Sequence, residues 1–190
     1  MQTEFPFPLE IRKSKRKSFS IEIQKNGSVL LRTPLFVRQK EAEAFLLKHQ
    51  NWILTTLEKV NQRKEKLLKI DPLSLEELEN LRERAKIEIP PIVDAYAKKM
   101  GVQYQKITMR CQKTRWGSCS SKGNLNFNYL LLLAPEEVLH YVVVHELCHL
   151  KEMNHSKRFW QEVEAVLPDY KPSYQWLKVH GNELLAYANK

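Results

Sequence analysis

The sequence predicts an α+β fold, in which a small antiparallel or mixed sheet packs against one buried helix. Three observations predict this fold. Apolar and polar residues alternate over residues 9–33 and again over residues 102–129, which is the period of a strand. The segments between and after them carry apolar residues at helical spacing. Residues 136–150 are apolar on nearly every side, so this helix belongs at the centre of the fold.

Residues 9–33 are predicted to form an N-terminal β-ribbon. The side chains expected on its inner face are apolar and two residues apart: Leu9, Ile11, Phe19, Ile21 and Ile23. Asn26-Gly27 favours a type I′ turn, after which residues 29–31 are expected to form the returning strand of the hairpin. The basic run of residues 12–17 has two interpretations. A solvated, lysine-protected edge is favoured over an arm that contacts phosphates.

The next segment is predicted to be helical scaffold. Residues 37–69 have the spacing of one or two amphipathic helices. Ser74 and Glu77 form a capping-box pattern that opens a helix running to about Met100, with Gly101 as its stop. Pro90-Pro91 should kink or split this helix near Ile89, because proline removes backbone hydrogen bonds from a helix interior.

Residues 102–109 and 123–129 are predicted strands, with a turn or loop at 115–120 between them. The strand at 125–129 is expected to present an edge to which an extended peptide could add. Pro135 and the two acids after it start the central helix. A further helix is expected to end at Pro168, and a final helix to begin near Ser173.

The central helix carries the motif His145-Glu146-Leu147-Cys148-His149, which fits the H-E-x-x-H pattern of zinc hydrolases. Residues four apart lie one turn apart on a helix, so both imidazoles can face one metal ion. Glu146 is the next residue around the helix and can take a proton from a metal-bound water. His155 is the expected third ligand, which leaves a fourth position open, as in catalytic zinc sites.

Length and composition suit a cytoplasmic protein. The 190 residues are expected to divide into an N-terminal ribbon and helical segment, residues 1–70, and a metallohydrolase core, residues 71–190, packed as one compact unit. Three cysteines fit a reducing compartment, and no apolar run is long enough to span a membrane. The net charge of +9 is compatible with weak polyanion binding, which we do not expect to be the main role.

Several motifs together resemble the YgjP-like metallopeptidase family of small bacterial zincin-type proteins. They are Arg115-Trp116-Gly117-Ser118-Cys119-Ser120, Asn126, Val143 to His149, and Asn154-His155-Ser156 with Phe159-Trp160. The resemblance to this family covers nearly the whole chain. The chain is also similar, more distantly, to SprT-type and WLM-type proteases. It implies a zincin-like core, one Zn²⁺ per chain held by His145, His149 and His155, and Glu146 as the base.

The spacing from His149 to His155 equals that of metzincins, but Glu152 stands where those proteins have glycine. Glycine allows a sharp turn there, so Glu152 predicts that the helix continues and turns later, near Asn154. The metzincin label is therefore not applied. If the turn did not return His155 to the metal, Glu162 would be the substitute ligand.

The first functional hypothesis is a zinc-dependent peptidase acting on a peptide or protein. Its oxyanion donor would be Arg115, Tyr129 or Tyr174. Asn126 and Asn128 are candidates for supporting the imidazoles or binding substrate. Arg115 and Trp116 could line the cleft, although packing and an ion pair explain them equally well.

Two other hypotheses remain open. The first is a nucleoside triphosphate pyrophosphohydrolase acting, for example, on UTP, with Arg110, Lys113 and Arg115 on the phosphates. Phosphate sites usually prefer magnesium and carboxylates, so this hypothesis ranks second. The other is a nucleic-acid-associated protein whose zinc is structural. A structural zinc needs a fourth protein ligand, and Cys148 points about 100° away from His149 on the helix.

Overall fold

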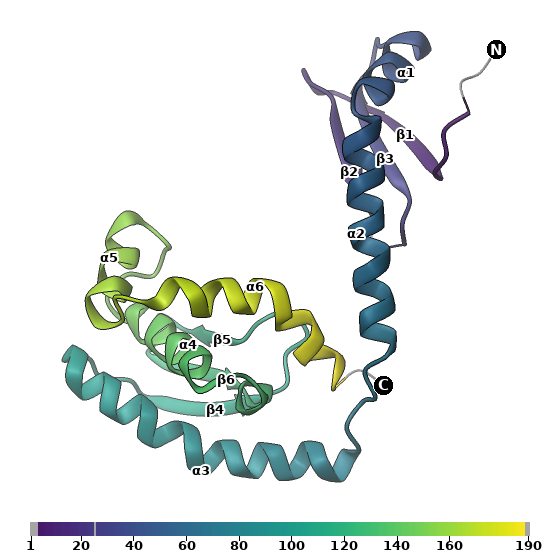
Figure 1. Cartoon of the computed structure of the whole chain (residues 1–190). Helices are drawn as coiled ribbons and strands as arrows, with labels where there is room; N and C mark the ends of the chain where they lie inside the picture. Colours follow the sequence, from purple (N-terminus) through teal and green to yellow (C-terminus); the bar gives the residue numbers. More distant parts are fainter. Residues whose placement is uncertain (1–3, 25, 189–190) are drawn as a thin grey trace. The chain divides into compact units, whose positions relative to one another are not determined.

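The computed structural model describes residues 4–24 and 26–188, and the described chain has an α+β fold with six α-helices and two three-stranded sheets (Figure 1). The chain divides into two compact units, residues 1–69 and residues 70–190. Each unit has its own sheet and its own buried apolar cluster. The predicted α+β class is confirmed.

The N-terminal unit contains a mixed sheet of three strands, β1 (Leu9–Ser14), β2 (Ser20–Ile23) and β3 (Val29–Pro34). The strand order is β1-β3-β2, with β2 antiparallel and β1 parallel to β3. The expected type I′ turn is absent, because Asn26 keeps a negative φ and only Gly27, at 86°, is left-handed. The Asn26 side chain instead accepts the Ser28 backbone N–H at 3.0 Å.

Two helices complete this unit, α1 (Gln39–Lys48) and α2 (Gln50–Leu68), within the segment predicted to be helical. Their apolar sides pack with the inner face of the sheet. The buried residues of this cluster are Phe7, Val29, Leu31, Ala42, Leu46, Ile53 and Leu57. Because these apolar sides are buried, the polar sides of α1 and α2 face the solvent.

The long helix α3 (Leu75–Met100) opens the C-terminal unit. The predicted capping box is present: Ser74 Oγ accepts the Glu77 N–H, and Glu77 accepts the Ser74 N–H at 2.8 Å. Gly101 ends the helix with a φ of 64°. The helix bends without splitting (Figure 1), although Pro90-Pro91 lies inside it. Buried side chains on either side of the prolines, among them Ile89 and Val93, hold it to the core.

The second sheet has the order β4-β6-β5, formed by β4 (Lys106–Arg110), β5 (Gly117–Cys119) and β6 (Asn124–Asn128). β6 lies in the centre, parallel to β4 and antiparallel to β5. The expectation that residues 125–129 form an edge is therefore wrong. The short strand β5, predicted as part of a loop, is an outer strand instead.

Helix α4 (Glu136–Cys148) is the central helix of the C-terminal unit. It contacts α3, α5, α6, β5 and β6, as well as the short 3-10 helix η1 (Tyr129–Leu133). The predicted burial is confirmed, since Val143, Val144 and Leu147 have no exposed surface. Packing on several sides, rather than helix propensity, holds a helix with three consecutive valines.

Helix α5 (Lys157–Val166) and helix α6 (Tyr170–Ala186) follow α4. Helix α6 begins three residues before the predicted Ser173. This earlier start places Pro172 in the first turn of the helix, where a proline costs no hydrogen bond. Across the described residues, no helix has the length and apolar character needed to cross a membrane.

Candidate metal centre

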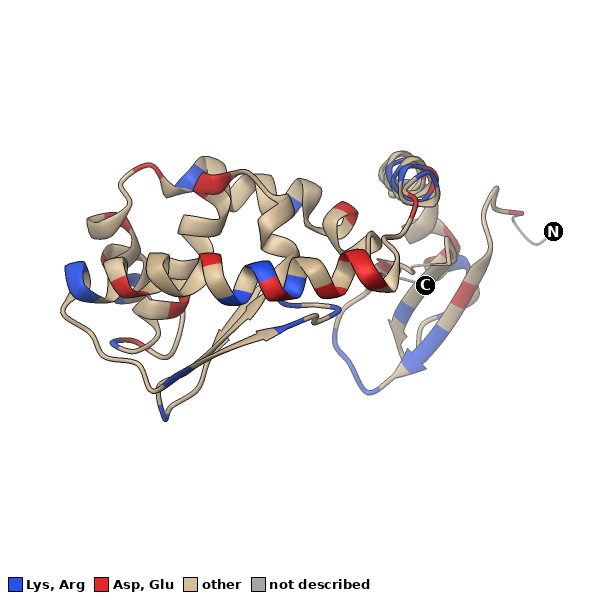
Figure 2. Cartoon of the chain, turned by 90° about the horizontal axis from the view of Figure 1, so that it is seen from below, with Lys and Arg blue, Asp and Glu red and all other residues tan. Residues whose placement is uncertain are grey.

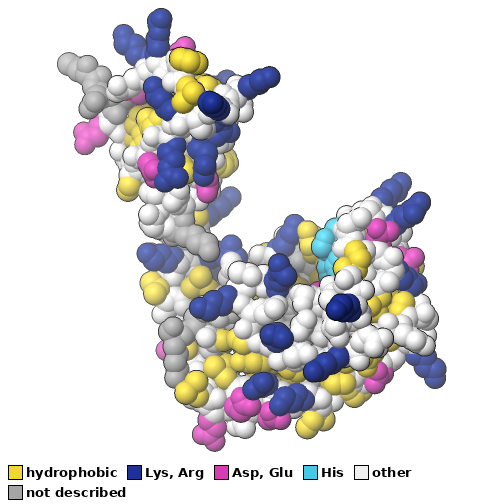
Figure 3. All heavy atoms as spheres, turned by 180° about the vertical axis from the view of Figure 1, so that it is seen from behind, with side chains coloured by type: hydrophobic (Ala, Val, Ile, Leu, Met, Phe, Trp, Pro, Cys, Tyr) yellow, Lys and Arg dark blue, Asp and Glu magenta, His cyan; other side chains and the backbone are white. Residues whose placement is uncertain are grey.

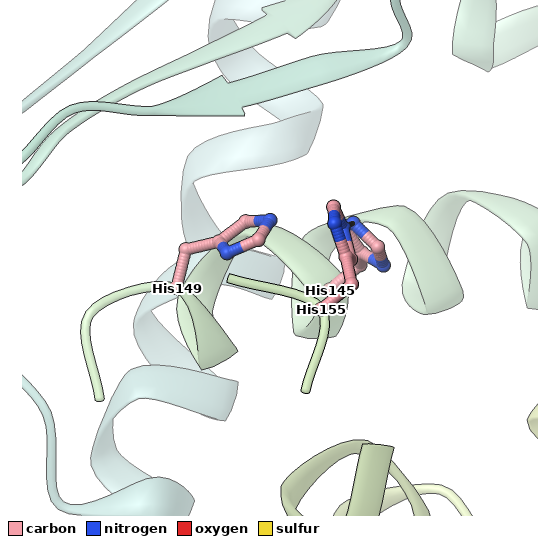
Figure 4. Close-up of side chains that lie close together, drawn as sticks. All are labelled: His145, His149 and His155. Carbon is pink, nitrogen blue, oxygen red and sulfur yellow. Dashed lines mark hydrogen bonds between the residues drawn. The ribbon is translucent and has the colours of Figure 1, made fainter. Parts of the chain in front are cut away.

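Three imidazoles converge at the end of α4. His145 lies in its last turn, His149 is the residue that caps it, and His155 lies in the loop before α5. One ligand nitrogen of each lies within 4.8 Å of the other two, and the Nε2 atoms of His145 and His155 are 3.0 Å apart. Figure 4 shows the three rings turned toward a common point. The helical i, i+4 spacing explains the first pair.

A tight turn returns His155 to this point. The helix ends at Cys148, and the backbone N–H of Lys151 donates to the Cys148 carbonyl at 3.0 Å. The prediction that the helix continues past Glu152 is therefore wrong. No non-glycine residue in the described chain has a positive φ, so this turn needs no glycine. The hydroxyl of Ser156 then caps α5 by accepting the N–H of Phe159.

The other nitrogens of two imidazoles have partners that orient the rings. His149 Nδ1 lies 3.1 Å from the Glu152 carbonyl oxygen, which can only accept, so Nδ1 carries the proton and Nε2 keeps its lone pair. His145 Nδ1 lies 3.4 Å from the Tyr141 hydroxyl. Ligating histidines commonly have such partners, because these fix the ring and its tautomer.

The ring of Phe159 packs against all three imidazoles. Its centroid lies 4.8 Å from that of His145, 4.6 Å from His149 and 4.7 Å from His155. Phe159 itself is fully buried. Burial lowers the pKa of His145 to about 3, with the neighbouring His149 and His155 adding to the effect. Burial likewise lowers the pKa of His149. Neutral imidazoles are the form that binds a metal.

The donor set fits one zinc ion. Nitrogen ligands about 2.0–2.1 Å from a tetrahedral ion lie about 3.3 Å from one another, so the widest pair here has to close by at most about 1.5 Å. Three imidazoles are a ligand set that zinc takes in catalytic sites. Among the described residues, no cysteine or carboxylate joins this group. Cys148 is fully buried in the core, and Glu162 pairs with Lys151 at 2.8 Å.

Glu146 lies beside the histidines and is almost fully buried, with 5% of its surface exposed. Burial raises the pKa of its carboxyl to about 8, against the opposing charge of Arg115. The backbone of Gly117 in β5 approaches the carboxylate closely. A Cβ at position 117 would lie 2.6 Å from Glu146 Cγ and Oε1, which is too close for a side chain.

A cleft of about 600 Å³ opens over Glu146 and the three histidines. Its walls come from β5 and the loop before it, from α4 and the loop after it, and from α6. They include Thr114, Arg115, Trp116, Tyr141, Met153, Tyr174, Leu177 and Lys178. Trp116 is half-buried and packs on α6 at Gly181, where a Cβ would be 3.1 Å from its Nε1. Arg115 and Lys178 are the basic residues of the cleft lining, and Glu146 is its acidic residue.

Other predicted site residues lie outside the cleft. Asn126 donates to Ser118 Oγ at 3.1 Å and accepts from Arg110 at 3.0 Å. Asn128 is buried and donates to the carbonyls of Gln112 and Arg115. In the described chain both asparagines thus bond to the sheet and the 112–115 loop rather than to the imidazoles.

The remaining candidates are divided between two places. Tyr174 and Arg115 line the cleft. Tyr129 lines a separate hollow of about 400 Å³ with Arg82 and Arg110. Of the three residues expected to hold phosphates, Arg115 alone is part of the cleft lining, since Arg110 lies at that second hollow and Lys113 is not in the lining.

Sequence reasoning missed three residues of this site. Tyr141 precedes His145 by four residues, so helical spacing alone could have indicated it. Gly117 was seen as part of a motif, but its closeness to Glu146 depends on how β5 packs on α4. Lys178 carries no local signal, because α6 reaches the cleft only through tertiary packing.

Comparison with known proteins relates the chain to a protein family. The family described as YgjP-like, metallopeptidase domain, matches residues 17–79 and 74–180. A curated relative from Escherichia coli (strain K12), named UTP pyrophosphatase, is 36% identical over 58 residues. That match covers 30% of this chain and 35% of the relative. The chain therefore matches only about a third of the length of this relative.

Two solved structures of archaeal metallopeptidase zymogens are also similar. Abylysin from Pyrococcus abyssi is 27% identical to this chain, with a TM-score of 0.43. The matched region covers 49% of this chain and 92% of the abylysin chain. Jannalysin from Methanocaldococcus jannaschii has 26% identity and a TM-score of 0.42, with coverages of 48% and 93%.

Proposed function

Because the chain belongs to the YgjP-like metallopeptidase family, we propose that it is a zinc-dependent peptidase with its machinery in residues 71–190. In this proposal His145, His149 and His155 hold the ion, and Glu146 is the general base. The observation that carries it is the convergence of three imidazoles beside one buried carboxyl group, at the floor of an open cleft.

Zinc, when bound, acts as a Lewis acid that lowers the pKa of a coordinated water from about 15.7 toward about 7. The protein supplies the base. Glu146 accepts a proton from the attacking water at its carboxylate and returns it to the amine that leaves. A dication held by the histidines would oppose the effect of burial on the Glu146 carboxyl and favour its ionised form.

Gly117 supports this role of Glu146. Its missing side chain leaves the space that the carboxyl group fills, so the backbone of β5 limits where Glu146 can point. A general base needs this restriction, because proton transfer requires hydrogen-bond distance and alignment.

The shape of the cleft supports an extended substrate. β5 is an outer strand, and its residues Gly117, Ser118 and Cys119 line the cleft. An extended peptide can add to such an edge through main-chain hydrogen bonds. Arg115 and Tyr174 lie in the same cleft and are the candidates for stabilising the oxyanion.

Nucleotide hydrolysis is the second candidate. It is favoured by the two cations of the cleft lining, Arg115 and Lys178, and by the similarity to a protein named UTP pyrophosphatase. It ranks below peptide hydrolysis because the matched segment is short. In addition, Glu146 is the one carboxylate of the cleft lining and is assigned as the base, whereas a magnesium–phosphate site uses one or two carboxylates to hold the ion.

A substrate screen on zinc-loaded protein tests the proposal. Unfolded casein-like proteins and nucleoside triphosphates are incubated with the wild type and with the Glu146→Gln variant. We expect new peptide ends with the wild type and none with the variant. Release of phosphate or pyrophosphate from UTP without peptide cleavage would reverse the order of the two candidates.

A further inference from the structure

The net charge of the chain is concentrated in its N-terminal unit. Residues 1–69 contain 15 Lys and Arg against 7 Asp and Glu, a net charge of +8, whereas residues 70–190 contain 16 against 15. Acidic and basic residues are interspersed along α3 (Figure 2), while Lys and Arg side chains gather on the face of the N-terminal unit that Figure 3 shows. The unit that lacks the metal centre is therefore the one that attracts anions.

Many of these cations lie on one exposed strand and the loop after it. In β1 the residues from Glu10 to Ser14 are all exposed, and Lys15 and Lys17 continue the exposed basic run. Arg12 forms a surface ion pair with Glu10, and Arg32 forms one with Glu22. Lys13 donates to a neutral carbonyl, that of Val37, at 3.0 Å, so its charge stays available.

A hollow of about 620 Å³ lies between β1 and the start of α1. Lys13 of β1 and Arg38, the residue before α1, both line it. In the loop that leads to Arg38, the side chain of Phe36 is 94% exposed. Phe36 precedes Arg38 by two residues, so an exposed aromatic ring and a cation lie close together in the chain, a combination that suits stacking and phosphate contact with a nucleic acid.

We propose that this surface, formed by the run from Lys13 to Lys17 together with Phe36 and Arg38, binds single-stranded nucleic acid. The cations would contact the phosphates, and Phe36 would stack on a base. This combination tolerates any sequence, because every base has a flat face and every nucleotide has a phosphate. The surface is independent of the metal centre and would tether the enzyme to RNA or to DNA.

A membrane surface fits these observations less well. Helices that bind lipid present an apolar side to it, whereas the apolar sides of α1 and α2 are buried in the core of the unit, for example at Leu46 and Ile53. An acidic protein would use the same cations and could also contact the phenyl ring, so the binding test includes polyglutamate as a competing ligand.

The test measures binding of the full-length chain to fluorescein-labelled single strands of about 20 nucleotides, one of RNA and one of DNA, by fluorescence anisotropy. We expect dissociation constants of about 1–100 µM, weakening steeply between about 50 mM and about 200 mM salt. A preference for RNA over DNA would indicate recognition of the 2′-hydroxyl within the same proposal. Absence of binding to both strands at the lower salt concentration would overturn it.

Variants locate the surface. Phe36→Ala should weaken binding roughly tenfold with little change in the salt dependence, because it removes stacking alone. The pair Lys15→Glu and Lys17→Glu should weaken binding at least tenfold and lower the salt slope by about 1.4, since each phosphate contact to a single strand contributes about 0.7. The control pair Lys106→Glu and Lys122→Glu changes charge equally at exposed positions of the C-terminal unit and should bind like the wild type.

Two further outcomes would contradict the proposal. An equal loss in the control pair would show a general effect of net charge rather than a surface. Binding of polyglutamate or of anionic phosphatidylserine vesicles as tightly as RNA would assign the surface to another partner. Circular dichroism on each variant confirms folding, and Phe36→Ala keeps the test valid if a charge-reversal variant unfolds. Zinc content and hydrolysis play no part in this readout.

Discussion

Gly117 and Glu146 are packed so closely that position 117 has no room for a methyl group. A Cβ there would lie 2.6 Å from Glu146 Oε1 and 2.7 Å from its Cδ. We therefore expect Gly117→Ala to displace the carboxyl group and to lower kcat/KM at least a hundredfold, while the histidines keep their zinc. Steady-state kinetics together with metal analysis measures both effects.

Gly101→Ala is the matched control for that variant. Gly101 has a φ of 64°, and nothing lies within 4 Å of a Cβ built there. Alanine at this position should therefore lower the free energy of unfolding by about 1 kcal/mol through backbone strain, with unchanged kcat/KM. Equal activity losses in the two variants would mean that Gly117 acts through stability alone.

His155 should be a metal ligand and Glu162 should not. His155→Ala is expected to weaken zinc affinity by more than about a hundredfold, because it removes one of three nitrogen donors. Glu162→Ala removes only a surface ion pair with Lys151, where both side chains are more than a third exposed, so zinc affinity should not change. Competition with a chromogenic chelator measures both, and the reverse order would make Glu162 the ligand.

Tyr141 is expected to orient His145 through its hydroxyl group. Tyr141→Phe keeps the ring and its packing but removes the group 3.4 Å from His145 Nδ1, so zinc affinity should fall about tenfold. Tyr170→Phe is the control, because Tyr170 stacks on Tyr141 with a centroid distance of 6.0 Å and, among the described residues, forms no hydrogen bond to an imidazole. Unchanged zinc affinity in Tyr141→Phe would remove Tyr141 from the site.

Asn128 should matter for stability rather than for substrate binding. It is buried, and its amide bonds to the carbonyls of Gln112 and Arg115 and to the N–H of Leu130. Asn128→Ala leaves these groups without partners and should cost about 2 kcal/mol of unfolding free energy. Urea denaturation measures this cost. A stable variant with a raised KM would instead place Asn128 in substrate recognition.

The sequence predicted those parts of the fold and site whose signal is local. Helical spacing was enough to bring His145 and His149 to one side of α4, and the capping box at Ser74 marked where α3 starts. The polar turn after α4 was expected to return His155, and the structure brings it there.

Features that depend on tertiary packing were not predictable in this way. The strand order β4-β6-β5 puts residues 125–128 in the centre of a sheet, because β6 pairs in parallel with β4 as well as antiparallel with β5. Pro90-Pro91 lies in an unbroken helix because the core holds both halves. Asn126 and Asn128 were candidates for supporting the imidazoles or binding substrate, but their partners lie in the sheet and the adjoining loop.

The central claim is that a histidine-bound zinc ion and the Glu146 carboxylate together activate water. The most direct measurement is the zinc content and peptide hydrolysis of the wild type, His145→Ala and Glu146→Gln, purified side by side. We predict about one zinc per chain in the wild type and in Glu146→Gln, little zinc in His145→Ala, and hydrolysis in the wild type alone. Equal zinc in His145→Ala, or turnover by Glu146→Gln at the wild-type rate, would contradict the claim.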